Sequence, residues 1–407
     1  MGIGPLDGVR VIELANYVAA PAGGALMADM GADVVKIEPP AGDGWRGRPA
    51  YAGKPEDLAN AGATLSPQFN HDNRGKRSVT LDIANPAGGE TVRLLIDRAD
   101  IFLTNLLPKR RVRLGFDPAT LLARNPRLIY VGVTGYGPDG PDADRPGFDY
   151  SAFWASSGIM SRLVPPEQNP PLSRPALGDH TTGLTNVTAA LAALRLRDRT
   201  GEGQVCELSL FSVSHWVNGA DLVTAAATGN EPPLHDREQP LNPLWNTYRC
   251  ADDGWLLLTM IQPDAYWRRF CRALGCEQWL DRAEWSSTVG RAADSRALTA
   301  AIAAELARHS RADWQRRLDA EGIIYAPVST VGEAVAREQT AAQQTIQTVE
   351  TGAGPLPVVR APFQIAGAEI APRGPAPELG QHSEAVLLEA GLSWEQIADL
   401  RERGAFG

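Results

Sequence analysis

The stretch that decides the fold reads Gly8-Val9-Arg10-Val11-Ile12-Glu13-Leu14, and its apolar residues are typical of a buried strand. A helix of small residues is expected at 25–30, and a second strand follows as Val34-Val35-Lys36-Ile37-Glu38. Two strands that are joined by one helix run parallel in the same sheet. The pattern therefore predicts an α/β fold with a Rossmann-like, doubly wound sheet.

Further apolar runs extend this sheet along the chain. Strands are expected at 79–83, 101–105, 128–133 and 205–210, with helices between them. The composition changes near 229–242, where the chain becomes rich in proline and polar residues. A smaller α+β lobe is expected beyond that point.

These patterns predict two domains, because 407 residues are too many for one simple core. The expected parts are a large domain over 1–225, a linker over 226–242, a small α+β domain over 243–330, a return linker over 331–362, and a C-terminal part over 363–407 that completes the large domain.

Composition and charge exclude several classes of protein. The formal net charge of -9 argues against general nucleic-acid binding. The four cysteines have neither a CxxC pair nor a histidine at zinc spacing, so we expect reduced thiols and no metal site. The N-terminal residues lack the basic and apolar regions of a signal peptide, and no apolar run is long enough to cross a bilayer. We expect a cytoplasmic protein that binds no membrane.

The first strand–helix–strand unit raises the question of a nicotinamide cofactor. Glu38 ends the second strand, as an acidic residue does in many NAD sites. The glycine-rich turn of such sites is absent, however, and Asn16-Tyr17-Val18-Ala19-Ala20-Pro21 stands in its place. We therefore expect no NAD.

A turn of small residues, Leu177-Gly178-Asp179-His180-Thr181-Thr182-Gly183, leads into a long Ala-rich helix that is expected to end near Arg199-Thr200-Gly201. Asp179 stands at the helix start, where free backbone N–H groups favour a carboxylate. The reference pKa of an aspartate is about 3.9, so we expect Asp179 to be ionised at neutral pH. From these residues alone, Asp179 is either the N-cap of the helix or a reactive group.

Six further motifs occur in a fixed order along the chain. They are Pro5-Leu6-Asp7-Gly8-Val9-Arg10-Val11, Gly31-Ala32-Asp33-Val34-Val35-Lys36-Ile37-Glu38, Asn73-Arg74-Gly75-Lys76-Arg77-Ser78, Arg113-Leu114-Gly115, Arg199-Thr200-Gly201-Glu202-Gly203-Gln204 and Leu379-Gly380-Gln381-His382. Together with the Asp179 turn, this ordered set resembles the class III CoA-transferases of the CaiB/BaiF type. That family includes formyl-CoA transferase and α-methylacyl-CoA racemase.

The resemblance implies an enzyme that moves CoA from an acyl-CoA donor to a carboxylic acid acceptor. Asp179 is then the catalytic residue, which attacks the donor thioester and forms first an acyl-aspartyl anhydride and then an aspartyl-CoA thioester. The resemblance also implies a homodimer in which two ring-shaped chains interlock.

The phosphates of CoA require cations on an otherwise acidic chain. Two basic segments, 74–77 and 109–113, follow expected strand ends, although either one alone is also typical of a solvated face. The resemblance implies CoA-binding roles for eight residues: Asn16, Tyr17, Val18, Ala19, Arg74, Lys76, Asn105 and Arg113.

Two other functions stay open. A racemase would exchange the α-proton of a 2-methylacyl-CoA, but the resemblance places Phe148 and Gln262 where racemases have a histidine and a glutamate. His180, beside Asp179, is the residue that could replace them. The second alternative is an inactive CoA-binding module, which the presence of Asp179 disfavours.

Overall fold

The structure is a computed structural model that describes residues 3–47, 66–165, 167–352 and 354–406. The chain divides into two compact units. The larger unit combines Met1–Glu231 with Ala341–Gly407, and the smaller unit is Pro232–Thr340. Along the described residues, no helix is both long and apolar enough to span a bilayer.

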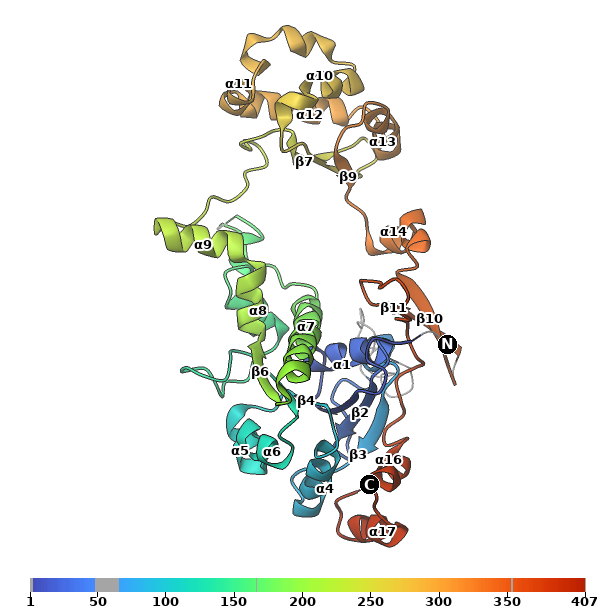
Figure 1. Cartoon of the computed structure of the whole chain (residues 1–407). Coiled ribbons are helices and arrows are strands. Elements are labelled where there is room, and N and C mark those ends of the chain that lie inside the picture. The colour runs from blue at the N-terminus through green and yellow to red at the C-terminus, as the bar shows by residue number, and fades with distance from the viewer. Residues whose placement is uncertain (1–2, 48–65, 166, 353, 407) are drawn as a thin grey trace. The chain divides into compact units, whose positions relative to one another are not determined.

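A six-stranded parallel sheet forms the centre of the larger unit (Figure 1). Its strands stand in the order β3-β2-β1-β4-β5-β6, so the order reverses between β1 and β4. Their bounds are β1 Arg10–Leu14, β2 Asp33–Glu38, β3 Arg77–Thr80, β4 Ile101–Thr104, β5 Ile129–Thr134 and β6 Gln204–Ser209. The predicted parallel α/β sheet is confirmed.

Both faces of this sheet are buried. Consecutive residues of a strand point to opposite faces, so Val11 joins one hydrophobic core and Ile12 joins the other. Helices α1 (Ala19–Asp29) and α7 (Leu177–Thr200) contribute to the first core. The second core is covered by α4 (Pro86–Ile96) and by two C-terminal helices, α16 (Ser383–Glu389) and α17 (Trp394–Glu402).

Shorter elements complete the larger unit. They are α3 Pro67–Asn73, α5 Pro108–Leu114, α6 Pro118–Arg124, the π-helix η1 Asp149–Ala155, the 3-10 helix η2 Met160–Arg162, α8 Leu210–Val217, α9 Gly219–Thr228, α15 Glu338–Ala342, which begins in the smaller unit, β10 Ile346–Thr351 and β11 Gly354–Val359.

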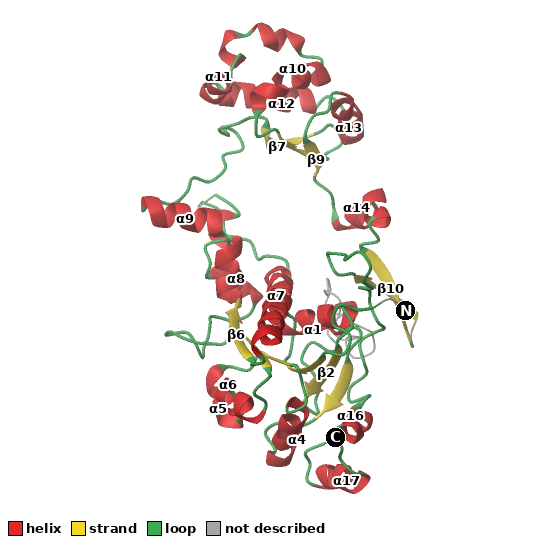
Figure 2. Ribbon diagram, viewed as in Figure 1, coloured by secondary structure: helices red, strands yellow, loops and turns green. Residues whose placement is uncertain are grey.

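The smaller unit is a three-stranded antiparallel sheet packed with helices (Figure 2). The expected hairpin forms between β7 (Trp245–Arg249) and β8 (Trp255–Thr259), and β9 (Tyr325–Pro327) pairs with β8. Its helices are α10 Pro263–Leu274, η3 Glu277–Asp281, η4 Ala283–Trp285, α11 Thr288–Ala293, α12 Ser295–Leu306, α13 Arg311–Ala320 and α14 Val331–Ala336.

The two segments that were expected to be linkers contain regular structure. Helix α9 extends to Thr228, into the segment 226–242. The segment 331–362 holds α14, α15 and an antiparallel hairpin of β10 and β11. The Thr330 side chain caps the start of α14, and four β-branched residues in 346–351 favour a strand. These local signals were obscured by the proline and glycine content of the segment.

Candidate functional site

Helix α7 presents Asp179 from its first turn. The helix begins at Leu177 and ends at Thr200 before Gly201, as the sequence predicts. Its N-cap is Ala176, so the alternative in which Asp179 is the N-cap is wrong. Ala176 has a positive φ of 64°, which costs a non-glycine residue about 1–2 kcal/mol. Backbone strain of this kind gathers at functional sites.

Asp149, on η1, holds the start of α7. Its Oδ1 accepts a hydrogen bond from the backbone N–H of Gly178 at 3.0 Å, and the residue is 3% exposed. Only glycine permits this approach, because a Cβ on residue 178 would lie 2.3 Å from Asp149 Oδ1. The sequence analysis missed Asp149. The only local signal for it is an acidic residue at the first position of η1, directly after Phe148.

The carboxyl group of Asp179 does not have the low pKa that was expected of it. Burial raises the pKa of Asp179 to about 7, and the charges of Asp149 and Asp72 add to this rise, whereas His180 opposes it. The reference value of an aspartate holds for a solvated group, and this carboxyl shares a partly buried site with two others. Asp179 therefore titrates near neutral pH.

Close packing of small residues joins α7 to α1. A Cβ on Gly183, one turn after Asp179, would lie 3.0 Å from the Cβ of Ala22. Asn186 Nδ2 donates a hydrogen bond to the carbonyl oxygen of Ala19 at 2.9 Å. The two helices lie side by side (Figure 1), so the start of α1 is held beside the helix that carries Asp179.

Two of the predicted CoA-binding residues meet where the strand order reverses. Asn16 follows β1 and Asn105 follows β4. The backbone N–H of Asn16 donates to Asn105 Oδ1 at 3.2 Å, and Asn105 Nδ2 donates to the carbonyl oxygen of Asn16 at 2.8 Å. Ligands of open parallel sheets bind outside the carboxyl ends of the strands at such a reversal.

The other residues of this loop lie at the start of α1. Tyr17 has a φ of 65°, its N–H donates to Asp43 Oδ1, and its ring packs edge-on against Phe148. Val18 is the N-cap of α1 and Ala19 its first residue, and both side chains are buried. These two residues therefore offer a ligand their backbone N–H groups and not their side chains.

Arg74 and Lys76 are not the free cations that the sequence predicts. The Arg74 guanidinium donates both Nε and Nη2 to Asp29 and is 2% exposed. Lys76 Nζ donates to the carbonyl oxygen of Pro21 at 2.8 Å and forms an ion pair with Glu13. Burying a cation without a partner is very costly, so the fold supplies anions for both. Neither side chain faces solvent in this structure.

The second basic segment divides between two roles. Arg111 is buried and pairs with Glu207 at 2.7 Å. Arg113, in the last turn of α5, is exposed, and among the described residues no ion pair holds its guanidinium. Of the three described cations that were predicted to bind CoA, Arg74, Lys76 and Arg113, only Arg113 can meet a phosphate without losing an internal partner.

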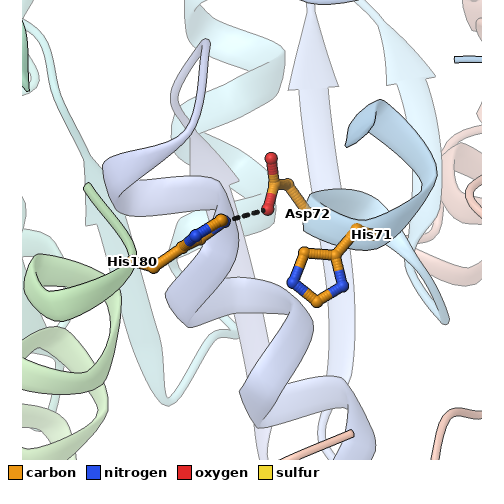
Figure 3. A group of neighbouring side chains, drawn as sticks. All are labelled: His71, Asp72 and His180. Atoms are coloured by element: carbon orange, nitrogen blue, oxygen red, sulfur yellow. Dashed lines mark hydrogen bonds and ion pairs between the residues drawn. The ribbon is translucent and has the colours of Figure 1, made fainter. Parts of the chain in front are cut away.

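Three side chains, those of His71 and Asp72 on α3 and of His180 on α7, form a cluster beside Asp179 (Figure 3), and the sequence analysis named only His180. His180 Nε2 lies 2.9 Å from Asp72 Oδ1, and the rings of His71 and His180 pack edge-on with centroids 5.3 Å apart. Together with Trp45, they line a cavity of about 210 Å³. Asp72 and His180 are 108 residues apart, so no local pattern could have paired them.

This cluster is of a composition that metals bind, since its three ligand atoms lie within 4.8 Å of one another. Its hydrogen bonds, however, argue against metal binding. Arg74 Nη1 lies 3.2 Å from His71 Nδ1, where its charge would repel a second cation. The expected absence of a metal stays a prediction.

Comparison with known proteins identifies the fold and the family. The structure resembles a crystal structure of a CaiB/BaiF family protein from Brucella suis, with a TM-score of 0.83 and 30% identity over 96% of this chain and 100% of that one. The fold is that of a CaiB/BaiF protein. Residues 6–383 match the family model for CoA-transferase family III. The chain therefore belongs to CoA-transferase family III and is an enzyme of that family, which confirms the resemblance seen in the motifs.

Curated relatives cover almost the whole chain. It is 30% identical over 399 residues to (R)-2-hydroxy-4-methylpentanoate CoA-transferase from Clostridioides difficile, with 98% of each chain covered. It is 32% identical over 388 residues to succinate–glutarate CoA-transferase from Agrobacterium fabrum, with 95% of each chain covered.

Proposed function

We propose that this enzyme transfers CoA from an acyl-CoA donor to a carboxylic acid, with Asp179 as the nucleophile. The observation that carries the proposal is the position of Asp179. It stands in the first turn of α7, beside the start of α1 and near the reversal point of the sheet. The relatives of this chain include an (R)-2-hydroxy-4-methylpentanoate CoA-transferase and a succinate–glutarate CoA-transferase, and these names agree with the proposed activity.

The reaction proceeds in four balanced steps. The Asp179 carboxylate attacks the thioester carbonyl, the C–S bond breaks, and CoA leaves as a thiolate from an acyl-aspartyl anhydride. The thiolate attacks the aspartyl carbonyl and releases the donor acid. The acceptor carboxylate then attacks the aspartyl-CoA thioester, and the thiolate leaves again. In the last step the CoA thiolate attacks the acceptor's acyl carbon in the second anhydride and the C–O bond there breaks. This yields the new acyl-CoA and restores the Asp179 carboxylate.

Backbone donors stabilise the negative charge of the tetrahedral intermediates in this scheme. We assign this role to the N–H groups of the first turns of α7 and α1 that lack a partner within the helix, other than that of Gly178, which already donates to Asp149. Such preorganised donors act on the oxyanion as it develops.

For CoA itself, we assign direct contacts to the loop 16–19, to Asn105 and to Arg113. The paired asparagines hold the loop at the sheet reversal, and Arg113 supplies a charge to a phosphate. We assign Arg74 and Lys76 a structural role and no direct contact with CoA, because their charges are buried in ion pairs with Asp29 and Glu13. The cofactor requirement that follows is CoA alone, without NAD or metal.

We also propose a Rossmann-like CoA-binding domain and an interlocked homodimer, on the strength of the family and the strand order. A cytoplasmic location agrees with four unpaired cysteines, three of them buried. Light scattering that shows a monomer at micromolar concentration would contradict the dimer.

A panel of acyl-CoA donors and carboxylic acids, analysed by mass spectrometry, tests the function. We expect new CoA thioesters with the wild-type enzyme and none with Asp179→Asn. In deuterated water, a 2-methylacyl-CoA should exchange its α-hydrogen far below the rate of transfer, because Phe148 carries no ionisable proton. Rapid exchange with inversion and no transfer would establish a racemase, and no turnover with any pair would favour an inactive binding module.

A further inference from the structure

The side chain of His180 is bound to a fixed carboxylate. Its Nε2 lies 2.9 Å from Asp72 Oδ1, and Trp45 Nε1 donates to Asp72 Oδ2 at 3.2 Å. Asp72 is 2% exposed, so both of its oxygens are held away from water. The His180 side chain is 41% exposed and reaches the cavity that Trp45 also lines. Figure 3 shows the imidazole of His180 turned toward Asp72.

The neighbouring imidazole does not compete for this carboxylate. Arg74 Nη1 lies 3.2 Å from His71 Nδ1, so that nitrogen accepts and carries no proton. Burial lowers the pKa of His71 to about 4, and the charges of Arg74 and His180 add to the effect, against that of Asp72. Of the two histidines, only His180 lies against a carboxylate oxygen that favours its positively charged form.

The surroundings of His180 favour its charged form. Burial lowers the pKa of His180, but the hydrogen bond to Asp72 and the negative charges of Asp72, Asp179 and Asp149 outweigh burial and raise it. The titratable groups that face the pair are Asp149 on η1, His71, Arg74 and Lys76 at and just after α3, and Asp179 on α7 itself.

The same charge acts on the next residue of the helix. The negative charges of Asp149 and Asp72 raise the pKa of Asp179, and the positive charge of His180 lowers it. An opposite charge within about 4–6 Å favours the charged form of a group by about 1–3 pKa units. The nucleophile of the proposed mechanism is the anion, so the opposing charge decides how much of it exists at neutral pH.

We propose that the Asp72–His180 pair is a positioning device, which keeps an imidazolium beside Asp179 and so maintains the reactive carboxylate at neutral pH. This inference rests on the proposed function, since it concerns how the nucleophile is prepared. Asp72 fixes the imidazole, His180 supplies the charge, and His71 stays neutral. His180 touches none of the reacting atoms in this account and acts through Asp179.

The first test is the pH profile of the acylation of Asp179, measured by rapid quench and mass spectrometry with an acyl-CoA donor and no acceptor. For His180→Gln, we expect the acid limb of the rate to move upward by about one pH unit, with about tenfold slower acylation at pH 6.5 and recovery at high pH. His180→Lys keeps a positive charge and should restore the limb. Asp72→Asn should shift it less than His180→Gln, because that change also removes a negative charge facing Asp179.

Two results would overturn the inference. In the first, His180→Gln slows acylation equally at every pH without moving the limb, as a structural role predicts. In the second, His180→Gln changes neither the rate nor the limb.

A second measurement does not depend on activity. The gain in unfolding free energy from Asp179→Asn, followed against pH by urea unfolding, reports the ionisation of Asp179. The pH at which that gain reaches its full value follows the pKa of the folded state, so it should lie about one pH unit higher in a His180→Gln background than in the wild-type background. If wild-type Asp179 is never acylated, the proposed mechanism fails, and this pH alone still decides whether His180 controls the carboxyl group. An unchanged value of this pH would refute the pair's role.

Discussion

The Asp149 carboxylate accepts a hydrogen bond from the backbone N–H of Gly178 at 3.0 Å, so one carboxylate fixes the helix that presents another, Asp179. The arrangement gives Asp149 two separable effects. Its hydrogen bond orients α7, and its charge raises the pKa of Asp179.

Substitutions of Asp149 should separate these effects. Asp149→Asn keeps an oxygen acceptor and removes the charge, so the acid limb of the transfer rate should move to lower pH. Asp149→Ala should also lose the hydrogen bond to the Gly178 N–H, at a cost of about 0.5–2 kcal/mol in unfolding free energy, as for a lost capping interaction. Urea unfolding and pH–rate profiles of the two variants measure this difference. Identical profiles for wild type and Asp149→Asn would show that the Asp149 charge does not reach Asp179.

Asp179→Asn should stabilise the protein at high pH. The pKa of Asp179 is raised from 3.8 to about 7 in the folded state. Between these values the folded state binds more protons than the unfolded state, so the stability linked to this group falls as pH rises and is lost above about 7. Because the group is partly exposed, we expect a gain of about 1–2 kcal/mol at pH 8 and almost none below pH 4. A gain that is equal at both pH values would contradict the raised pKa.

The contact between α1 and α7 leaves no space for a larger residue at 183. Gly183→Val would drive side-chain atoms into Ala22 and the backbone of Gly23, at a cost of about 1–3 kcal/mol. Gly219→Ala is the matched control, because a Cβ there meets no atom within 4 Å. Thermal unfolding of both variants should show a lowered midpoint only for Gly183→Val. Equal midpoints would mean that the helices are not closely packed.

Basic residues of the site should divide into binding and structural groups. Arg113→Gln should raise the KM for acyl-CoA and weaken its salt dependence with little change in stability, because Arg113 is exposed. Arg74→Gln should cost about 3–5 kcal/mol of stability, because it leaves Asp29 buried without its partner. Lys109→Gln, on the same helix as Arg113 and highly exposed, is the control for a nonspecific charge effect. The assignment fails if Arg113→Gln and Lys109→Gln behave alike.

Much of the fold follows from local sequence patterns. The apolar runs of β1, β2, β4 and β5 predict four parallel strands. The small residues near Gly183 indicate a helix that packs closely against its neighbour. The prediction of Asp179 as the catalytic residue came from its turn and from the ordered motifs. Such features depend on residues that are near one another in the chain, so a single sequence contains them.

The rest of the site depends on contacts between distant segments. The carboxylate that binds the Gly178 N–H at the start of α7 comes from Asp149, 29 residues earlier, and the partner of His180 is Asp72. A basic run also does not reveal whether its charges face solvent, and the burial of Arg74 with Asp29 appears only once α1 and α3 meet. The pKa of Asp179 could not be predicted for the same reason, since it arises from burial and from three residues around it.

The central claim is that Asp179 forms a covalent anhydride with the acceptor acid, which leaves one oxygen atom of the acceptor in the Asp179 carboxylate. Isotope transfer tests this claim most directly. The enzyme is incubated with an acyl-CoA donor and an acceptor acid labelled with ¹⁸O in its carboxylate, then digested and analysed by mass spectrometry. In the proposed steps, the bridging oxygen of the second anhydride belongs to the acceptor and stays on Asp179 when the thiolate takes the acyl group. The peptide that contains Asp179 should therefore gain ¹⁸O only when donor and acceptor are both present. New CoA thioester without any ¹⁸O in that peptide would contradict the account.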